Sequence, residues 1–552
     1  MATIASQATG NWSSPSTWSG GVLPGVNDVA QVVTGHVVTI DQNVTVQSLS
    51  NTGNGKFVLT GSTPRTITCT VSMLLSVTAT GTCLLEIDGS YSATGSVINT
   101  GLVSIGSHTG TTALAAINIL AAATGSVAFT GTSWQADNQA TGNEPLVLLN
   151  SSTADLDINL TTALQGNGTA FAQAFSSLGD SAITLTVPII SAGLNISGGT
   201  TAVPFVKPVT INTGSIVGIV GAGAGFSGTR TTAGVITVNG NIGPGSSPSL
   251  SVNGGVQLII NGNVTGGNTS SGSATGITLN GFNFDITVNG DVTGGTSNSS
   301  GAVGIQGGSV GGKITVNGNV SANQLTGGSG AQGISFNTIN TFTGISYITV
   351  TGDVRGGPNA GGISAGGSAA GGIQVWIGGS VYAGLSASTN SLGVGVSLNN
   401  NGSNLVVEGP EISTRGTSGS PAIQCTTQFV GTVTIGKANQ TTTITNTAYA
   451  AAIAVPYLVA DDAHLIWRYV ATNNYVDVEQ IPPLSDVDSD IAVTDVRAGV
   501  VYDNDDKVGT MIVPDPEDVL YGVPVDDTVG TAHVTLADAA AITGSQIASL
   551  ST

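Results

Sequence analysis

The amino-acid sequence predicts an all-β protein, a right-handed parallel β-helix of about 28 residues per coil followed by a small β-rich C-terminal module. Three observations lead to this fold: an unusual composition, a phrase that recurs at near-constant spacing, and alternation of apolar and polar residues within that phrase. Of 552 residues, 81 are Gly, 40% are hydrophobic and only 8% are charged. This composition excludes a disordered chain, and the absence of Gly at every third position excludes collagen. The length also exceeds one ordinary compact core, which favours stacked repeats.

The repeat is clearest between residues 234 and 407. One phrase, typified by residues 286–292 (ITVNGDV), occurs six times, with steps of 22, 28, 28, 34 and 27 residues between copies. A second phrase begins with Gly-Ile at residues 276, 304, 333 and 362, with steps of 28, 29 and 29. Each repeat therefore contains at least two strands in fixed phase. One such unit cannot close a core alone, whereas stacked coils bury each inward row against the next.

Apolar residues or Gly alternate with polar residues inside the phrase, which is the period of a strand with one buried face. We expect Thr287 and Thr315 to point outward. The residues expected to point inward are Ile286, Val288, Val292, Ile314, Val316 and Val320. At the inward Gly290 we expect a corner that has no room for a side chain, and the preceding Asn289 indicates a positive φ at this Gly.

Asn precedes the central Gly in four copies of the phrase, and these four residues have two possible roles. They are Asn239, Asn261, Asn289 and Asn317. Stacked in register, their side chains could form a hydrogen-bonded ladder along the solenoid. They could equally be ordinary turn asparagines that face water.

The part of the chain before the regular repeats has the same texture of short strands and glycines, and we interpret residues 51–455 as one solenoid. Residues 1–50 differ, because Trp12 and Trp18 precede a turn at Pro24 and two short apolar segments. This arrangement resembles the opening of bacterial and phage β-helix surface proteins, including those with a G8 domain, whose solenoids are pectin-lyase-like. The resemblance implies that residues 1–50 cap the open end of the first coil.

The composition changes near residue 455, which predicts a domain boundary at 450–456. Residues 451–552 hold 17 of the 31 acidic residues and little Gly. In the predicted module, residues 456–552, the phrase at 495–510 is echoed from 518 to 532. These phrases resemble the terminal region of phage tail-fibre and virion-appendage proteins, which implies an attachment or trimerisation role. A short helix is predicted over residues 536–542.

The charge balance argues against several classes of partner. A net charge of −20 with only 11 Lys and Arg argues against nucleic acid and anionic membranes, because both require clustered cations. No segment has the roughly 18 consecutive apolar residues of a membrane span, so membrane insertion is not expected. Residues 1–7 have no basic and no apolar region, so a cleaved export signal is not expected either.

The residues that usually hold metals or disulfides are sparse. Cys69, Cys83 and Cys425 are too few for a disulfide framework or a four-ligand zinc site, and we expect buried free thiols. The histidines lie in no metal-ligand spacing; they are His36, His108, His464 and His533. Residues 503–506 (DNDD) have calcium-ligand side chains but lack the Gly and Glu of an EF-hand, which favours a tight acidic turn. No metal or cofactor is expected.

An enzymatic role has to be weighed, because many phage tailspikes are trimeric β-helices that cut polysaccharide with paired carboxylates. Glu86 and Asp88, two residues apart on one strand, are the best acid pair in the solenoid. Asp285 is a second candidate, beside Phe282 and Phe284, which are either a sugar platform or part of an insertion that packs on the coil. Asp291 and Asp353 replace Asn at an outward turn, where a solvated carboxylate is the simpler interpretation. With aromatic residues at only 5%, the sequence favours a binding protein over an enzyme.

The architecture and the resemblance together predict a structural virion appendage, a tail fibre, tailspike or head spike, located on a phage particle. Its expected partners are two further copies of itself in a homotrimer, other virion proteins at the C-terminal module, and a host-surface polysaccharide or receptor. The alternatives are a polysaccharide depolymerase, a capsid decoration protein, and a bacterial adhesin or ice-binding surface protein. An adhesin of the ice-binding kind would need flat, regular Thr rows, which we expect the insertions between repeats to break.

Overall fold

The computed structural model describes most of the first 384 residues and short strands beyond them. The described residues are 2–75, 83–105, 115–120, 122–136, 147–149, 153–165, 175–176, 181–191, 194–195, 207–217, 220–222, 234–245, 249–252, 255, 257–268, 274–280, 282–296, 302–308, 311–323, 331–338, 346–358, 360–367, 373–384, 395–398, 404–409, 411–413, 423–425, 432–435, 443–445, 465–470, 475–480, 501–502, 507–508, 524–525 and 528–529. The chain divides into two compact units, residues 1–437 with 442–479, and residues 438–441 with 480–552. The boundary predicted at 450–456 lies outside the described residues.

The first unit is a β-solenoid, in which strands of successive coils pair in parallel. Among the described residues, the largest sheet has 25 strands. They are β1 (Thr3–Ala5), β3 (Val29–Val32), β5 (Val44–Asn51), β7 (Thr66–Leu75), β9 (Ser96–Ile105), β11 (Ser126–Ala136), β13 (Asp155–Gln165), β15 (Ile183–Thr186), β16 (Ile189–Ser191), β18 (Val209–Ile216), β20 (Val235–Ile242), β22 (Gln257–Asn261), β23 (Val264–Thr265), β25 (Phe282–Val288), β26 (Val292–Thr293), β28 (Gly311–Val316), β29 (Val320–Ser321), β31 (Ser346–Val350), β32 (Val354–Arg355), β34 (Ile373–Ile377), β35 (Val381–Tyr382), β37 (Asn404–Val407), β38 (Glu411–Ser413), β40 (Thr432–Ile435) and β41 (Thr443–Thr445).

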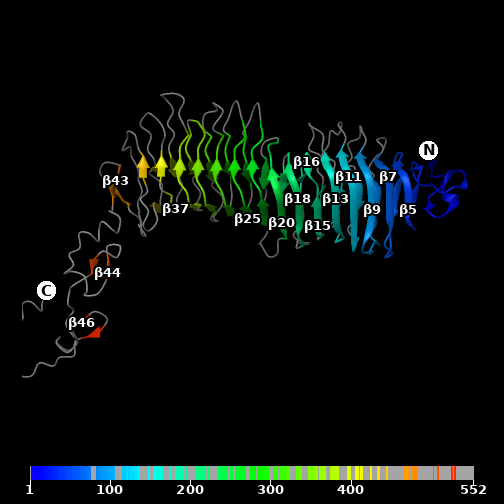
Figure 1. Ribbon diagram of the computed structural model, residues 1–552, viewed down its shortest axis with the longest axis horizontal. Helices are drawn as coiled ribbons and strands as arrows, with labels where there is room; N and C mark the ends of the chain where they lie inside the picture. The colour runs from blue at the N-terminus through cyan, green and yellow to red at the C-terminus, as the bar shows by residue number, and fades with distance from the viewer. Residues whose placement is uncertain are drawn as a thin grey trace, which may run out of the picture. The chain divides into compact units, whose positions relative to one another are not determined.

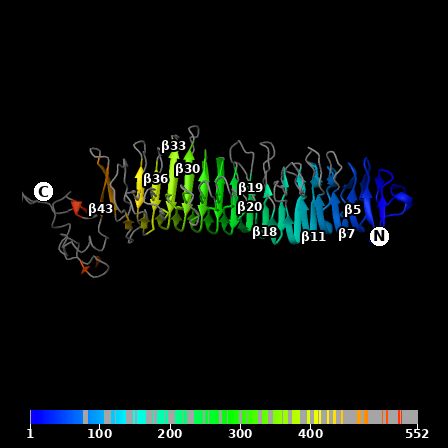
Figure 2. The same ribbon diagram turned by 90° about the horizontal axis from the view of Figure 1, so that it is seen from above.

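Two further parallel sheets form another wall of the solenoid, one in each half. The sheet of the N-terminal half consists of β2 (Gly10–Asn11), β4 (Val37–Thr39), β6 (Lys56–Leu59), β8 (Cys83–Ile87), β10 (Ala115–Ile119), β12 (Val147–Leu149) and β14 (Phe175–Ser176). The sheet of the C-terminal half consists of β17 (Leu194–Asn195), β19 (Val220–Ala222), β21 (Leu250–Val252), β24 (Ile277–Leu279), β27 (Ile305–Gly307), β30 (Ile334–Thr338), β33 (Ile363–Gly367), β36 (Val396–Leu398) and β39 (Ile423–Cys425). Both views show the strands side by side in chain order (Figures 1 and 2).

Strand pairing reproduces the spacing of the sequence repeat. Val288 pairs with Val316 and then Val316 with Val350, although the second coil is longer than the first. In the opposite wall Ile277 pairs with Ile305, which continues the second phrase in the same way. Upstream, β5 pairs with β7 and β7 with β9, so the less regular segments are coils of the same solenoid. The predicted fold class is therefore confirmed as a parallel β-solenoid.

The core is the set of inward rows, and its parity agrees with the sequence. Ile286, Val288, Val292, Ile314, Val316 and Val320 are all buried with exposed fractions of 0%. Thr287 and Thr315 lie on the outer side of the same strands and are partly exposed. Stacking places each β-branched side chain against its equivalents above and below, which buries apolar surface worth roughly 25 cal/mol per Å². Ala274, Ala302, Ala322 and Ala331 make a small separate cluster.

The central glycines of the phrase stack on one another, but their backbone differs from the prediction. A Cβ added at Gly290 would lie 2.5 Å from the carbonyl oxygen of Gly262, and one at Gly318 would lie 2.4 Å from that of Gly290. The lack of room for a side chain is thus confirmed. The predicted positive φ is wrong for Gly290; in this stack the described positive φ belongs to Gly240. Gly is required at residue 290 because the backbones of neighbouring coils approach closely there. It is not required for a left-handed backbone conformation.

The N-terminal segment buries both predicted tryptophans. Trp12 and Trp18 are 1% and 0% exposed, and their rings make an edge contact with centroids 4.8 Å apart. The Trp18 indole N–H donates to the Trp12 carbonyl oxygen at 2.9 Å. Two short 3-10 helices surround Trp18, η1 (Pro15–Thr17) and η2 (Ser19–Gly21). Coils already begin in this segment, because β1 pairs with β3 and β2 with β4.

The described parts of the C-terminal region are two-stranded sheets. They are β42 (Leu465–Val470) with β43 (Tyr475–Gln480), β44 (Val501–Tyr502) with β45 (Lys507–Val508), and β46 (Pro524–Val525) with β47 (Thr528–Val529). The last two pairs are antiparallel hairpins at equivalent positions of the duplicated phrase. The duplication therefore encodes one hairpin per copy, and the tight acidic turn predicted at residues 503–506 lies outside the described residues. The helix predicted at 536–542 lies outside the described residues.

Replacing Gly290 with Ala should destabilise the solenoid, because the added methyl group collides with the carbonyl oxygen of Gly262. The expected cost is about 1–3 kcal/mol, as for other overpacked sites. Gly308→Ala is the matched control, since no atom lies within 4 Å of a Cβ added there. We expect a lower guanidinium unfolding midpoint for Gly290→Ala and an unchanged or higher one for Gly308→Ala. Equal midpoints for the two variants would contradict the proposed close packing of coils.

Candidate functional site

An exposed row of amides runs along the largest sheet, and we call Asn212, Asn239, Asn261, Asn289 and Asn317 the amide row. In each step the side-chain N–H of one Asn donates to the side-chain oxygen of the Asn in the preceding coil. These distances are 2.7 or 2.8 Å. Of the two alternatives that the sequence left open, the ladder is confirmed, and the asparagines that form it also face solvent.

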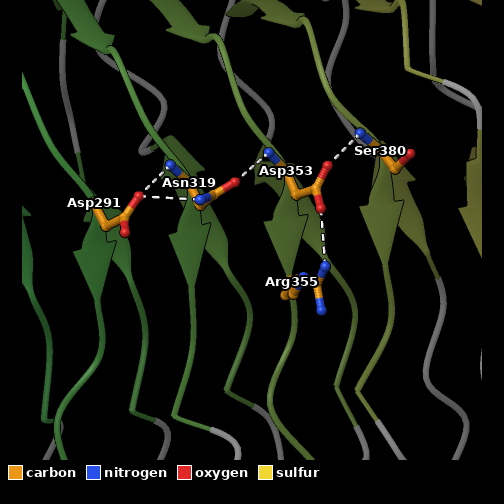
Figure 3. Close-up of polar contacts among 5 residues, drawn as sticks. All are labelled: Asp291, Asn319, Asp353, Arg355 and Ser380. Atoms are coloured by element: carbon orange, nitrogen blue, oxygen red, sulfur yellow. Dashed lines mark hydrogen bonds and ion pairs between the residues drawn. The ribbon is translucent and has the colours of Figure 1, made fainter.

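A second ladder, the corner ladder, lies two residues further along each strand and consists of Asn241, Asn263, Asp291, Asn319 and Asp353. Each side-chain oxygen accepts the backbone N–H of the equivalent residue in the next coil, at 2.8 or 2.9 Å. The N–H of Ser380 continues the series in the next coil by donating to Asp353 (Figure 3). Asp291 and Asp353 are thus turn carboxylates with a structural role. This agrees with the simpler interpretation of the sequence.

A row of threonines lies beside the amide row, and here the sequence prediction was wrong. Thr184, Thr210, Thr237, Thr287, Thr315 and Thr349 are in register, with Ile259 interrupting the row. We call this the threonine row. Coil lengths of 22 to 34 residues leave the register of the row intact, because the strands pair in the same register whatever length of chain connects them. Within one row, equivalent residues of successive coils lie about 4.8 Å apart along the solenoid. Neighbouring rows lie about 6.6 Å apart, which is the spacing of alternate residues along a strand.

The best candidate acid pair consists of two carboxylates with separate partners. Glu86 accepts a 2.6 Å ion pair from Lys56, and its side chain is 13% exposed. Asp88 follows β8 and accepts hydrogen bonds from the backbone N–H and the hydroxyl of Ser90, at 2.9 and 2.8 Å. Both side chains lie on the outer side, as the parity predicted. The contacts of Asp88 are those of a turn-forming Asp.

Asp285 occupies an outward, partly exposed position on β25, beside Gln257 and Lys313 in the adjacent coils. Its neighbour Phe284 is 2% exposed and belongs to the core, so Phe284 is not a platform for sugars. The side chain of Phe282 lies outside the described residues. Of the two aromatic residues that the sequence placed beside Asp285, Phe284 is therefore part of the core.

The cysteines and histidines show no sign of a reactive centre in the described part of the chain. Cys69 and Cys83 are free and buried, as predicted, and burial raises the pKa of both thiols to about 12. The Nδ1 atom of His36 lies 2.9 Å from the hydroxyl of Ser6. Among the residues described there is no group of three or more His, Cys, Asp or Glu that could hold a metal ion. Within the same residues, no helix has the length and hydropathy of a membrane span.

Two exposed aromatic residues on the outer face were missed at the sequence level. Tyr347 on β31 is 49% exposed, and Trp376 on the next strand, β34, is partly exposed. Trp376 pairs with Thr349, so it occupies the next position in line with the threonine row. The signal was present in the sequence, because Trp376 aligns with the outward Thr of the other copies of the phrase. The loose match of this copy, residues 375–381 (VWIGGSV), concealed it.

The chain matches no protein-family model, and no curated protein and no solved structure matches it either. The structure establishes a β-solenoid with ordered polar rows and with exposed or partly exposed aromatic residues on its outer face.

Asp353 should stabilise the corner ladder mainly because its side-chain oxygen accepts a hydrogen bond, and less because of its negative charge. Asp353→Ala leaves the N–H of Ser380, a residue 1% exposed, without its acceptor, and we expect a loss of about 1–3 kcal/mol. Asp353→Asn keeps that acceptor and gives up only the 2.9 Å ion pair with Arg355, which is partly solvated and worth about 0–1 kcal/mol. Guanidinium unfolding midpoints measure both effects. Equal losses for Ala and Asn would show that the ion pair matters instead.

Proposed function

We propose that this protein is a structural appendage of a phage particle, a tail fibre, tailspike or head spike, whose solenoid projects a binding surface towards the host cell. The observation that carries the proposal is the uninterrupted parallel stacking from β1 to β40, with an outer face of ordered polar rows. At about 4.8 Å per coil this stack is roughly 80 Å long. Such a shaft is stiff because every coil is hydrogen-bonded to both neighbours.

The chemistry of the outer face suits adhesion better than catalysis. Glu86 is engaged by Lys56, and Asp291 and Asp353 hold backbone N–H groups of the next coil. Among the described residues, the ordered rows of this face offer hydroxyls and amides, and aromatic rings lie beside them; such groups bind polysaccharides without cleaving them. We therefore favour a binding shaft over a depolymerase.

The partners that we propose follow from this role. Three copies would associate as a homotrimer, as in the phage fibres that the sequence resembles, and the C-terminal module, residues 456–552, would dock to other virion proteins or lock the trimer. Small β-hairpins such as β44 with β45 gain stability mainly by burying surface on partners, which supports a docking role for this region. The proposed location is the virion.

A bacterial surface adhesin is the second candidate, and the threonine row favours it. The row is regular from Thr184 to Thr349 apart from Ile259, so the sequence argument against a flat adhesive face no longer holds. An adhesin and a phage fibre would use the same outer face. They differ in where the chain is found, on the cell or on the particle.

Immunogold electron microscopy of a culture that produces the protein tests the proposal. We expect label on phage particles and none on the surface of intact cells, whereas label on cells alone would establish the adhesin.

Light scattering of the purified protein should give three times the chain mass of 54.3 kDa. A variant that lacks residues 456–552 should keep the β-rich circular dichroism spectrum but lose the trimer or its place on the particle. A stable full-length monomer would refute the trimer.

A further inference from the structure

The outer face carries two aromatic residues on the neighbouring strands β31 and β34, beside polar side chains and the partly exposed Val406. Tyr347 on β31 pairs with Lys313 on one side and Gln374 on the other. Trp376 pairs with Thr349 and Val406. Because Tyr347 and Trp376 are diagonal neighbours two residues apart in register, their Cα atoms lie about 7–8 Å from each other. Both side chains have outward parity, so neither contributes to the core.

The indole of Trp376 is held against the sheet by two contacts. A Cβ added at Gly378 would lie 2.9 Å from its Cη2 atom and 3.3 Å from its Cζ3 atom, so the rim of the six-membered ring lies next to Gly378. The indole N–H donates to Oε1 of Glu408 at 3.0 Å. Gly378 stands where earlier coils carry the amide row, and its missing side chain leaves the space that the indole occupies. The indole is therefore held at two points on its rim, and Trp376 remains partly exposed.

Tyr382, on β35, has an aromatic ring that already contacts a cation of the same chain. The guanidinium carbon of Arg355 lies 4.6 Å from the centroid of this ring. Arg355 is itself fixed by its ion pair with Asp353 (Figure 3). One face of Tyr382 is thus occupied by a cation from within the chain. Among the described contacts of Trp376, in contrast, Gly378 and Glu408 both meet the rim of the indole.

We propose that Trp376 and Tyr347 form a stacking platform for a polysaccharide, with the indole of Trp376 as its centre. The C–H groups on one face of a sugar ring carry partial positive charge and are attracted to the negative face of an aromatic ring. Thr349, Gln374 and Lys313 stand beside the two rings and can hydrogen-bond sugar hydroxyls. This inference rests on the proposed adhesive function and specifies where the shaft binds its receptor.

A polysaccharide fits this patch better than a second copy of the chain. The centre of a subunit interface is typically apolar and depleted of charged residues. Here Tyr347 lies between Lys313 and Gln374, and Trp376 is bonded to the carboxylate of Glu408. Rings bordered by charged and polar side chains match a ligand that has both an apolar face and a fringe of hydroxyls.

The test is a printed array of bacterial capsular and O-antigen polysaccharides, probed with the full-length protein, followed by titration of the strongest binder. We expect Trp376→Ala to bind that polysaccharide about tenfold more weakly and Tyr347→Ala to lose affinity as well. Trp376→Phe keeps a ring and should recover part of the affinity. Tyr382→Ala is the matched control, since it removes a ring on the next strand outside the platform, and it should bind like the wild type.

Several outcomes would overturn the inference, and they separate it from the proposed function. Wild-type protein that binds no polysaccharide overturns the platform, whereas the proposed appendage function is overturned only by the absence of label on phage particles. Wild-type binding that survives both Trp376→Ala and Tyr347→Ala overturns the platform alone. A change in the mass of the assembly on Trp376→Ala, measured by light scattering, would mean that the indole packs against a second copy. Circular dichroism melting curves check that each variant is folded, and Tyr347→Ala serves if Trp376→Ala is not.

Discussion

The register between successive coils is the constraint on which the rest of the structure depends. Strands of neighbouring coils exchange backbone hydrogen bonds, so each inward side chain sits directly over its equivalent one coil earlier. A slip of one residue would turn the apolar rows of Val288 and Val316 out and the threonine row in. The cost of such a slip grows with every coil that it affects, which is why coil lengths can vary while the register does not.

Two features at the corner reinforce this register from outside the core. The stacked glycines let neighbouring backbones approach so closely that a Cβ at Gly290 would lie 2.5 Å from the carbonyl oxygen of Gly262. The corner ladder then ties each turn to the next through a side-chain oxygen and a backbone N–H. Because Asn and Asp supply that oxygen equally well, the two acids in the repeats are interchangeable with Asn and need no catalytic explanation. The outer face remains available for binding.

The solenoid could be predicted from the sequence because every second residue of each strand is buried. This produces an alternation of apolar and polar residues that can be recognised without knowing which coils are in contact. It also predicted the crowding at Gly290, but not its cause, since a tight turn and a close approach both select Gly. The threonine row was wrongly expected to be broken because the repeat steps vary in length. Those steps count every residue of a coil, including the connections, whereas the register depends only on how the strands pair. The platform at Trp376 was missed because the orientation of an indole follows from Gly378 and from Glu408 on the next coil, which no local pattern encodes.

Engineered disulfides across the longest repeat step would test the register most directly. Thr315→Cys with Thr349→Cys places two thiols on paired residues whose Cα atoms are about 4.8 Å apart, within the range that a disulfide can bridge. Thr315→Cys with Tyr347→Cys is the mismatched control, with Cα atoms about 8 Å apart, beyond that range. Peptide mapping under oxidising conditions should find the first bridge and not the second. A bridge in the mismatched pair alone would contradict a conserved register and, with it, the account of the outer face.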